Sequence, residues 1–436
     1  MEERISSYAI AIDVHDEKYV LVHGLYGFVD LISEENFYLL NKWIAEGIRI
    51  TTQDEKNFLE ELKKRNYIMS REEEILLRDD LIDRLVKRHQ KTITDLKSAT
   101  FIPSYRCNFD CPYCYERNLN RESPILTREQ VDVILSGYEL KELEHVGFYG
   151  GEPFLPEHMD IIGYIISRVP DAEYTAITNG YYLEEYIPLL KTVNVKQIQV
   201  TFDGTKEVHN QTRILRDGGG TFERILHGVK SCVKNNIPIK IRMNLNHRNI
   251  NSCYTFKEWL TTELANTELL TFDMQELFQY NGEKQAYLTN KVLEESQSGK
   301  KNIILENMPS LARFFYNGEH IKPIIGNCTS VLANRFYDPY GNIYACFLSV
   351  GTPKCSIGTY YPEFQYKSES ILTRKASEIE ECKQCKYLFL CGGGCPNPLI
   401  ESNSSIMKPN CRNMKYTLEH LLPWYIIMST EKSKII

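Results

Sequence analysis

The sequence predicts an α/β chain in three parts, whose central part is an open, partial barrel of six β/α units. Between residues 96 and 300, short strand-like apolar runs alternate with longer amphipathic runs of helical spacing. Such alternation is typical of parallel strands joined by crossover helices. The 13 cysteines are also unevenly distributed, with none before Cys107 and eight from Cys328 to Cys411. This distribution separates a front part and a C-terminal part from the centre.

The order of expected strands and helices in the front part, residues 1–95, predicts a small winged-helix-like module. Short strands separated by turn signals are expected at 8–14, 18–23 and 27–32. Helical spacing of apolar residues follows at 34–48, 54–65 and 72–91. The last of these is highly charged, and we expect it to link the front part to the centre.

The central part, residues 96–300, predicts six strands and at least four helices. The strands are expected at 99–105, 145–149, 174–177, 197–202, 238–245 and 270–277. The helices are expected at 127–143, 159–169, 183–191 and 221–235. The C-terminal part, residues 301–436, has weak periodicity and many turn residues, so we expect metal ligation more than an apolar core to impose its local structure.

Composition excludes several classes of protein. A net charge of −7 gives no electrostatic basis for binding nucleic acid or an acidic membrane surface. No apolar run approaches the length of a membrane span, and the start MEERISSYAI has no signal-peptide character. A cytoplasmic location is therefore expected. In that reducing compartment, clustered cysteines are more often metal ligands than disulfides.

The first cysteine cluster is CNFDCPYCYE, in which Cys107, Cys111 and Cys114 have the spacing CxxxCxxC. A structural zinc site would need a fourth ligand, and no histidine lies nearby. A CxxC redox pair would leave Cys107 unexplained. The third interpretation is a 4Fe–4S cluster held by three thiolates, which would have one iron free for a small molecule.

CxxxCxxC directly after a first strand, with aromatic Tyr115 behind it, resembles the signature of radical S-adenosylmethionine (SAM) enzymes. The resemblance implies that Cys107, Cys111 and Cys114 hold the cluster whose free iron binds the methionine moiety of SAM. One electron from that cluster then cleaves the sulfonium and yields a 5′-deoxyadenosyl radical.

Further motifs fall at the carboxyl ends of predicted strands, where barrel chemistry is expected. They are FYGGEP with Gly150, Gly151 and Glu152, TNG with Thr178 and Asn179, and VTFDG with Thr201. The resemblance assigns these residues, together with Tyr113, to SAM contacts. Arg213 is expected to pair with the methionine carboxylate, since a guanidinium suits a carboxylate bidentately. Arg242 is an alternative for that role, or else a barrel-wall arginine.

The C-terminal cysteines follow the pattern C-x12-G-x4-C, then C-x2-C-x5-C-x3-C, then C. This resembles the SPASM extension with two auxiliary 4Fe–4S clusters; the alternative is a zinc ribbon. The resemblance gives the distal cluster four ligands, Cys382, Cys385, Cys391 and Cys411. The nearer cluster receives three, Cys328, Cys346 and Cys395.

The nearer cluster is therefore one protein ligand short. We expect an open iron that takes a substrate thiolate, with Asp338, Asn334 or water as alternatives. Cys355 is a weaker candidate, because a small buried thiol is the simpler interpretation there. Cys232 and Cys253 are likewise expected to be core or surface thiols.

Together these features resemble radical SAM/SPASM maturases of ribosomally made peptides. The resemblance implies hydrogen abstraction from a precursor peptide and an intrapeptide crosslink, most simply a cysteine thioether. Carbon–carbon or carbon–oxygen crosslinking, and sulfatase-type formylglycine maturation, are the alternatives; a multi-cluster electron carrier would need no SAM pocket. The expected partners are the precursor, whose leader binds the front module by strand addition, and a reductant such as flavodoxin or ferredoxin. The expected cofactors are SAM and three 4Fe–4S clusters.

Overall fold

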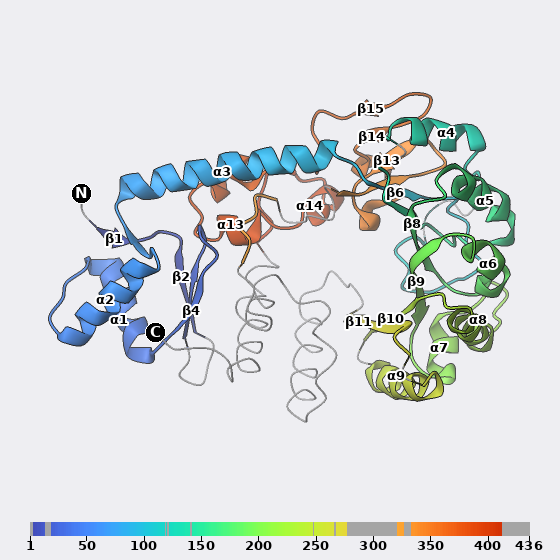
Figure 1. Ribbon diagram of the computed structural model, residues 1–436, viewed down its shortest axis with the longest axis horizontal. Helices are drawn as coiled ribbons and strands as arrows, with labels where there is room; N and C mark the ends of the chain where they lie inside the picture. The colour runs from blue at the N-terminus through green and yellow to red at the C-terminus, as the bar shows by residue number, and fades with distance from the viewer. Residues whose placement is uncertain are drawn as a thin grey trace. The chain divides into compact units, whose positions relative to one another are not determined.

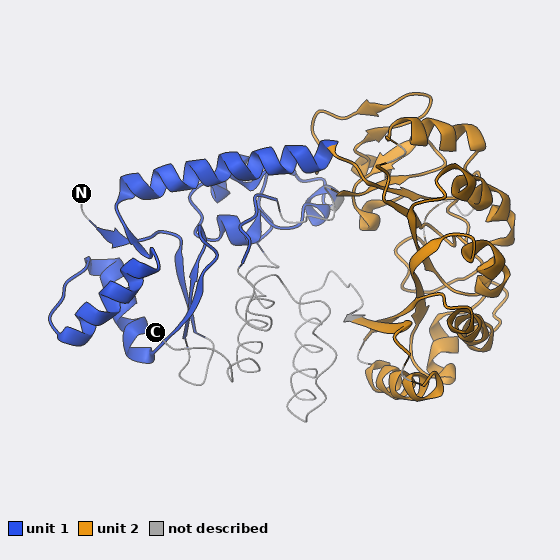
Figure 2. Ribbon diagram, in the orientation of Figure 1, with its two compact units in different colours: residues 1–94, 307–329, 373–436 blue, residues 95–306, 330–372 orange. Residues whose placement is uncertain are grey.

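The computed structural model divides the chain into two compact units (Figure 2). Unit 1 comprises residues 1–94, 307–329 and 373–436, and unit 2 comprises residues 95–306 and 330–372. The structure describes residues 3–13, 19–117, 119, 122–139, 142–246, 248–265, 267–276, 321–326 and 333–411. These compact units do not follow the order of the three predicted parts, because the C-terminal part contributes to both.

Unit 2 is built on a parallel-rich sheet, which confirms the predicted α/β class (Figure 1). Its parallel strands are β6 (Ser98–Phe101), β7 (His145–Phe148), β8 (Glu173–Thr178), β9 (Asn194–Phe202), β10 (Ile239–Leu245) and β11 (Leu270–Glu276). They are neighbours in chain order, as the six predicted strands require.

The helices between these strands include the four that the sequence predicts and two that it missed. Those predicted are α4 (Arg128–Ser136), α5 (Met159–Arg168), α6 (Leu183–Leu190) and α8 (Phe222–Lys234). Those missed are α7 (Lys206–Thr212) and α9 (Ile250–Glu263). Cys232 and Cys253 are buried on α8 and α9, so both are core thiols, as expected.

The two faces of the sheet differ in polarity, as the residues of β10 illustrate. Its residues alternate between buried apolar side chains and half-buried polar ones. The buried set is Ile239, Ile241, Met243 and Leu245, and the polar set is Lys240, Arg242 and Asn244. Because side chains of a strand point alternately to opposite faces, one face of the sheet is an apolar core and the other is polar.

The sheet continues beyond the predicted barrel strands into residues of the C-terminal part. Strand β12 (Arg335–Tyr337) pairs in parallel with β6, so β6 is not an edge strand. Strands β13 (Asn342–Tyr344), β14 (Gly358–Thr359) and β15 (Gln365–Tyr366) then add in antiparallel order. An unpaired β6 would expose a row of backbone donors and acceptors, which this addition satisfies.

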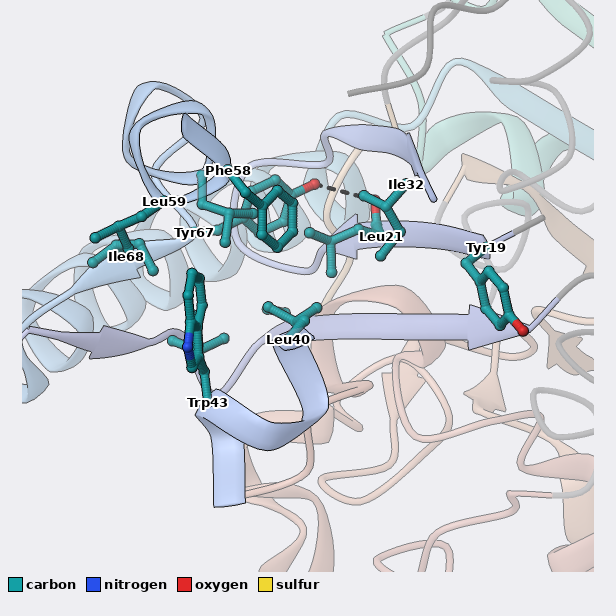
Figure 3. Packing of buried hydrophobic residues seen from close by; sticks show 12 residues of the cluster. Tyr19, Leu21, Ile32, Leu40, Trp43, Phe58, Leu59, Tyr67 and Ile68 are labelled. Atoms are coloured by element: carbon teal, nitrogen blue, oxygen red, sulfur yellow. Dashed lines mark hydrogen bonds between the residues drawn. The ribbon is translucent and has the colours of Figure 1, made fainter. Parts of the chain in front are cut away.

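Unit 1 contains residues 1–94, whose described strands and helices follow the order expected for the front part. An antiparallel sheet of β2 (Ala9–Asp13), β3 (Tyr19–His23) and β4 (Val29–Ile32) is followed by α1 (Glu34–Glu46), α2 (Gln53–Lys64) and α3 (Arg71–Thr94). The sequence missed only the short pair β1 (Arg4–Ile5) and β5 (Ile68–Met69) among the strands described there. Leu40, Trp43 and Phe58 pack with β-strand residues in one apolar cluster (Figure 3). The Tyr67 hydroxyl donates to Leu21 O at 3.1 Å within this cluster.

The cysteine-rich segment of unit 1 contains an apolar core, in addition to the cysteines that were expected to order it more than such a core would. Leu81 and Leu85 of α3 are buried together with a set from the C-terminal part: Ile325, Ala376, Ile379, Cys382, Leu388 and Phe389. Two short helices lie here, α13 (Leu388–Cys391) and α14 (Asn397–Glu401). Burial of aliphatic and aromatic side chains therefore stabilises this segment as well.

Among the helices that the structure describes, none is long and apolar enough to cross a membrane.

Candidate functional site

The first cysteine cluster lies on the loop that follows β6. The N–H of Phe109 donates to Cys107 Sγ at 3.4 Å, and the N–H of Cys114 donates to Cys111 O at 3.2 Å in a tight turn. Cys111 is buried, while Cys107 and Cys114 are half-buried. The loop is anchored by residues 214–216, because Asp110 N donates to Ile214 O and Arg216 N donates to Asn108 O. The three thiols are thus carried by a fixed loop at the carboxyl end of β6.

The two glycines of FYGGEP pack directly against the backbone that enters this loop. A Cβ on Gly151 would lie 2.3 Å from Arg106 O and 2.5 Å from Tyr105 O. A Cβ on Gly150, whose φ is +113°, would lie 2.9 Å from Ser104 O. Only glycine permits this approach, so the end of β7 is held against the start of the cysteine loop.

Glu152 connects this segment to the end of β8. Its buried carboxylate accepts hydrogen bonds from Thr178 Oγ1 at 2.6 Å, Asn179 N at 2.6 Å and Phe154 N at 2.8 Å. Burial raises the pKa of Glu152 to about 7, although these donors oppose the shift. Its oxygens are engaged by protein donors, so Glu152 orients the FYGGEP and TNG segments relative to each other.

Asn179 extends the same network to the cysteine loop. Its Nδ2 donates to Asn108 Oδ1 at 2.8 Å and approaches Cys107 Sγ at 3.9 Å. The structure therefore brings together the loops that follow β6, β7 and β8. Asn108 was not among the residues singled out in the sequence, because its role depends on this contact between separate loops.

A second network joins the cysteine loop to the ends of β9 and α7. Tyr113 donates to Asp203 Oδ2 at 2.5 Å, and Arg213 Nη1 donates to the Tyr113 hydroxyl at 2.9 Å. Thr212 Oγ1 also donates to Asp203 Oδ2 at 2.9 Å. Burial raises the pKa of Tyr113, so its hydroxyl stays protonated and donates. Asp203 was missed in the sequence, although the motif VTFDG carries it.

Arg213 is buried in this network with unused hydrogen-bonding capacity. Burial disfavours its charge, but Tyr113, Cys111 and Asp203 outweigh this effect and raise the pKa of Arg213. Its Nε atom and the Oδ1 atom of Asp203 are buried without a hydrogen-bond partner. A buried donor of this kind is costly unless a ligand satisfies it.

Arg242 has a different environment. Its Nη1 atom donates to Asp273 Oδ2 at 2.8 Å and its Nε atom donates to Asn244 Oδ1 at 3.0 Å. It is the register partner of Thr201 on the neighbouring strand, so the two side chains lie on the same polar face of the sheet. The Nε and Nη1 atoms of Arg242 both have partners within the protein. The Nε atom of Arg213 has none.

The donor set fits an iron–sulfur cluster with a small anionic ligand beside it. Three thiols share one loop, glycine backbone lies next to that loop, and an unpartnered guanidinium N–H is buried nearby. Within the described ranges, no three Cys, His, Asp or Glu side chains are gathered closely enough to define a metal site by geometry. The fit therefore depends on the chemistry of the donors and their surroundings.

The second group of cysteines lies in unit 1. Burial, together with the neighbouring thiols of Cys385, Cys391 and Cys411, raises the pKa of Cys382 to about 11. The four predicted ligands of the distal cluster are therefore close enough to interact electrostatically. Cys395 is half-buried in the same unit.

The other predicted auxiliary residues are distributed differently. Cys346 is half-buried at the end of the β12–β13 hairpin in unit 2, and Cys328 lies outside the described residues. Cys355 is buried, as a small core thiol would be. Asp338 and Asn334 are already hydrogen-bonded within unit 2, for instance to Tyr105 and Thr100. Their side chains have structural partners there.

A comparison with family models identifies the kind of domain that this fold and this site form. Residues 101–255 match the family model described as the Radical SAM superfamily. The chain therefore contains a radical SAM domain, which is the domain of an enzyme superfamily, and the cysteine loop, FYGGEP, TNG and VTFDG all lie within it.

Individual curated proteins show only low sequence identity to this chain. A GTP 3′,8-cyclase of Clostridium perfringens is 26% identical over 142 residues, which cover 31% of this chain and 42% of that protein. The chain thus spans less than half the length of that curated relative.

Two solved structures are similar over most of their length. A structure of anSMEcpe with AdoMet and a Kp18Cys peptide bound is 20% identical, with a TM-score of 0.55, and covers 77% of this chain and 99% of that one. Streptococcus suis SuiB bound to its precursor peptide SuiA is 13% identical, with a TM-score of 0.53, and covers 94% of this chain and 99% of that one. At these identities the similarity shows the fold.

Proposed function

We propose that this chain is a radical SAM maturase that modifies a ribosomally made precursor peptide. The observation that carries the proposal is the buried, unpartnered Nε of Arg213, which lies in one network with Tyr113 of the cysteine loop. A buried guanidinium N–H of this kind favours an acceptor on a bound ligand, and SAM has a carboxylate on its methionine moiety.

In this proposal Cys107, Cys111 and Cys114 hold a 4Fe–4S cluster. With SAM bound and an electron supplied, that cluster provides a 5′-deoxyadenosyl radical. Arg213 binds the methionine carboxylate, and Tyr113 and Asp203 hold the guanidinium in place. Gly150 and Gly151 leave room for ligand backbone, and Glu152 orients Thr178 and Asn179 toward the same ligand. Thr201 lies on the polar face of the sheet and is proposed to contact SAM, and Arg242 beside it on the same face is the alternative partner of the methionine carboxylate.

A peptide substrate is supported by two features. anSMEcpe and SuiB, whose structures share this fold, were both solved with peptides bound. Residues 1–95 also contain a three-stranded sheet whose outer strands, β2 and β4, each have one neighbour in the sheet. We infer that this module binds the leader of the precursor at a sheet edge, in the mode of strand addition.

The C-terminal cysteines belong to the proposal as ligands of two auxiliary 4Fe–4S clusters, as in a SPASM extension. Cys382, Cys385, Cys391 and Cys411 are the ligands of one, and their mutual electrostatic effect supports that set. Cys328, Cys346 and Cys395 are the ligands of the other. A flavodoxin or ferredoxin in the cytoplasm would deliver electrons.

The proposed product is a cysteine thioether within the peptide. Carbon–carbon or carbon–oxygen crosslinks and formylglycine formation are the competing products. They are distinguished by coexpressing the chain with the short reading frame beside its gene. A thioether removes one pair of hydrogens per link and leaves no cysteine thiol to alkylate. Carbon–carbon and carbon–oxygen crosslinks remove the same hydrogens but leave the thiols reactive. Formylglycine formation replaces a thiol by an aldehyde, which a carbonyl reagent detects.

The radical chemistry is tested by replacing Cys107, Cys111 and Cys114 together with alanine. After anaerobic reconstitution, this variant should lose the iron of one cluster and form no 5′-deoxyadenosine from SAM and dithionite. The control is Cys232→Ala, which removes a buried thiol on α8 and should leave cleavage intact. If the triple variant still cleaves SAM, the proposal is wrong.

A further inference from the structure

Arg374 is a buried guanidinium in unit 1 whose donors are all used by backbone carbonyls. It is 4% exposed. Its Nε donates to Ile406 O at 2.6 Å, its Nη1 to Gly392 O at 3.4 Å and Gly394 O at 3.0 Å, and its Nη2 to Gly393 O at 2.7 Å and Lys408 O at 3.0 Å. Five donor–acceptor pairs thus account for the five N–H groups of the side chain.

The backbone carbonyls of the three glycines between Cys391 and Cys395 all accept hydrogen bonds from this guanidinium. Gly392, Gly393 and Gly394 have φ values of +59°, +77° and +71°, a conformation that glycine adopts without strain. A Cβ on Gly393 would lie 3.0 Å from Arg374 Nη2. Asn410 completes the loop, since its N–H donates to Gly393 O at 2.9 Å and its Nδ2 to Cys395 O at 2.9 Å. Arg374 and Asn410 together therefore fix the backbone that carries Cys391, Cys395 and Cys411.

The charge of Arg374 has no carboxylate partner among the ion pairs of the described residues. A buried charge surrounded by neutral acceptors alone is unfavourable, so proteins normally pair it with an anion. Burial lowers the pKa of Arg374, and the groups that oppose this effect are the thiols of Cys382, Cys391 and Cys395. Gly392 directly follows Cys391 and Gly394 directly precedes Cys395, so the guanidinium is hydrogen-bonded to the backbone beside two of the predicted ligand thiols.

We propose that Arg374 is the counter-ion and positioning residue of the auxiliary iron–sulfur centre held by Cys382, Cys385, Cys391 and Cys411. This inference rests on the proposed function, which makes these cysteines cluster ligands. Their donor chemistry fits, because all four are thiols and a 4Fe–4S cluster with four thiolates carries net negative charge. The guanidinium offsets that charge, and its hydrogen bonds hold the loop in the form that the ligands need.

A consequence follows for the reduction potential of the centre. Reduction adds a negative charge, and a nearby cation in a low-dielectric interior stabilises the more negative state. Arg374 therefore makes this centre easier to reduce. A residue that only filled space in the loop would not have this effect.

The test uses the full chain in which Cys107, Cys111 and Cys114 are alanine, so that the front cluster does not contribute. In this background Arg374→Gln removes the charge, and Arg374→Lys keeps it without the five-donor fork. The control is Lys375→Gln, which removes the neighbouring charge, already paired with Glu378 at 2.8 Å. The readouts are iron and sulfide per chain, and an anaerobic redox titration followed by electron paramagnetic resonance.

We expect Arg374→Gln to lower the midpoint potential of one centre, with Arg374→Lys close to the parent and Lys375→Gln unchanged. Loss of one cluster in Arg374→Gln but not in Arg374→Lys also supports the proposal, because the charge is then required for assembly. Equal potentials and equal iron content in all four proteins overturn it, whereas loss of the cluster in both the glutamine and the lysine variants supports the positioning role, because both lack the five-donor fork. If the parent itself binds no iron, the auxiliary assignment fails, and this inference fails with it independently of SAM cleavage.

Discussion

Gly151 has no room for a side chain, and this single position controls how FYGGEP meets the cysteine loop. A Cβ there would lie within 2.5 Å of two backbone oxygens, those of Arg106 and Tyr105. Backbone oxygens cannot move aside as the end of a flexible side chain can. The position of Cys107 is thus coupled to a residue that is not itself a ligand.

The Gly151→Ala variant should therefore be destabilised by about 1–3 kcal/mol, since overpacking forces the backbone to shift. It should also bind less iron after reconstitution. The control is Gly163→Ala on α5, where the added Cβ would have no neighbour within 4 Å. That change should stabilise the protein by about 0.5–1 kcal/mol, because alanine favours a helix over glycine. Urea unfolding and iron analysis measure both effects, and equal behaviour of the two variants would contradict the steric argument.

Glu152 should give the protein a specific pH dependence. Its pKa rises from 4.5 to about 7 on folding, mainly through burial. The folded state therefore binds the proton more tightly than the unfolded state. The stability from this group is complete below about pH 4.5 and is lost as the pH rises through about 7, by about 3 kcal/mol in total.

Glu152→Gln cannot titrate, so the difference in unfolding free energy between the parent and this variant should decrease from pH 5 to pH 8. Urea titrations at several pH values measure this slope. The control is Glu142→Gln, which replaces an exposed carboxylate of the same unit. A difference that stays constant, or that increases with pH, would show that the Glu152 pKa is not raised.

At the scale of elements, the hairpin of β12 and β13 depends on one buried carboxylate. Asp338 Oδ1 accepts from the N–H groups of Tyr340 at 3.0 Å and Asn342 at 2.8 Å. Its Oδ2 accepts from the hydroxyl of Tyr105 at 3.0 Å and that of Tyr344 at 3.2 Å. The side chain thus joins the hairpin turn to the chain that leaves β6.

Asp338→Ala should lower the unfolding free energy by more than about 2 kcal/mol, because buried donors that lose their acceptor cost about 1–3 kcal/mol each. Asp338→Asn keeps the shape and one acceptor oxygen, so its loss should be smaller. Thermal and urea unfolding distinguish the two. If alanine and asparagine were equally tolerated, the carboxylate would not hold this hairpin.

The strands of the sheet also show which elements a local pattern of apolar residues can predict. The strands at β8, β9 and β10 were predicted because alternating or continuous apolar runs end at turn residues, and the structure confirms them. The strand β12 was not predicted, because three residues carry too little periodicity. Its position is determined by the unpaired edge of β6.

At the scale of the whole molecule, the two groups of cysteines belong to different compact units. Cys107, Cys111 and Cys114 lie in unit 2, whereas Cys382, Cys385, Cys391 and Cys411 lie in unit 1. Each group therefore has its own supporting core. The cluster proposed for Cys107, Cys111 and Cys114 should therefore assemble without Cys382, Cys385, Cys391 and Cys411.

Cys385→Ala should consequently lose the iron of one centre and still form 5′-deoxyadenosine from SAM without peptide, at a rate within a factor of a few of the parent. Iron analysis and chromatography of the nucleoside measure both. Cys253→Ala, which replaces a buried core thiol of unit 2, is the control for cysteine loss in general. Loss of SAM cleavage in Cys385→Ala would show that the two groups assemble together.

The sequence by itself determined the order of the six parallel strands and of four helices between them, the α/β class and the positions of the motifs. These depend on local periodicity and on the spacing of cysteines and glycines, which are properties of neighbouring residues. Only the tertiary structure decided that Arg242 pairs with Asp273 while Arg213 keeps a free Nε, and that backbone carbonyls accept hydrogen bonds from Arg374. Those contacts join residues far apart in the chain, and burial, which exists only in the folded state, gives them their energetic weight.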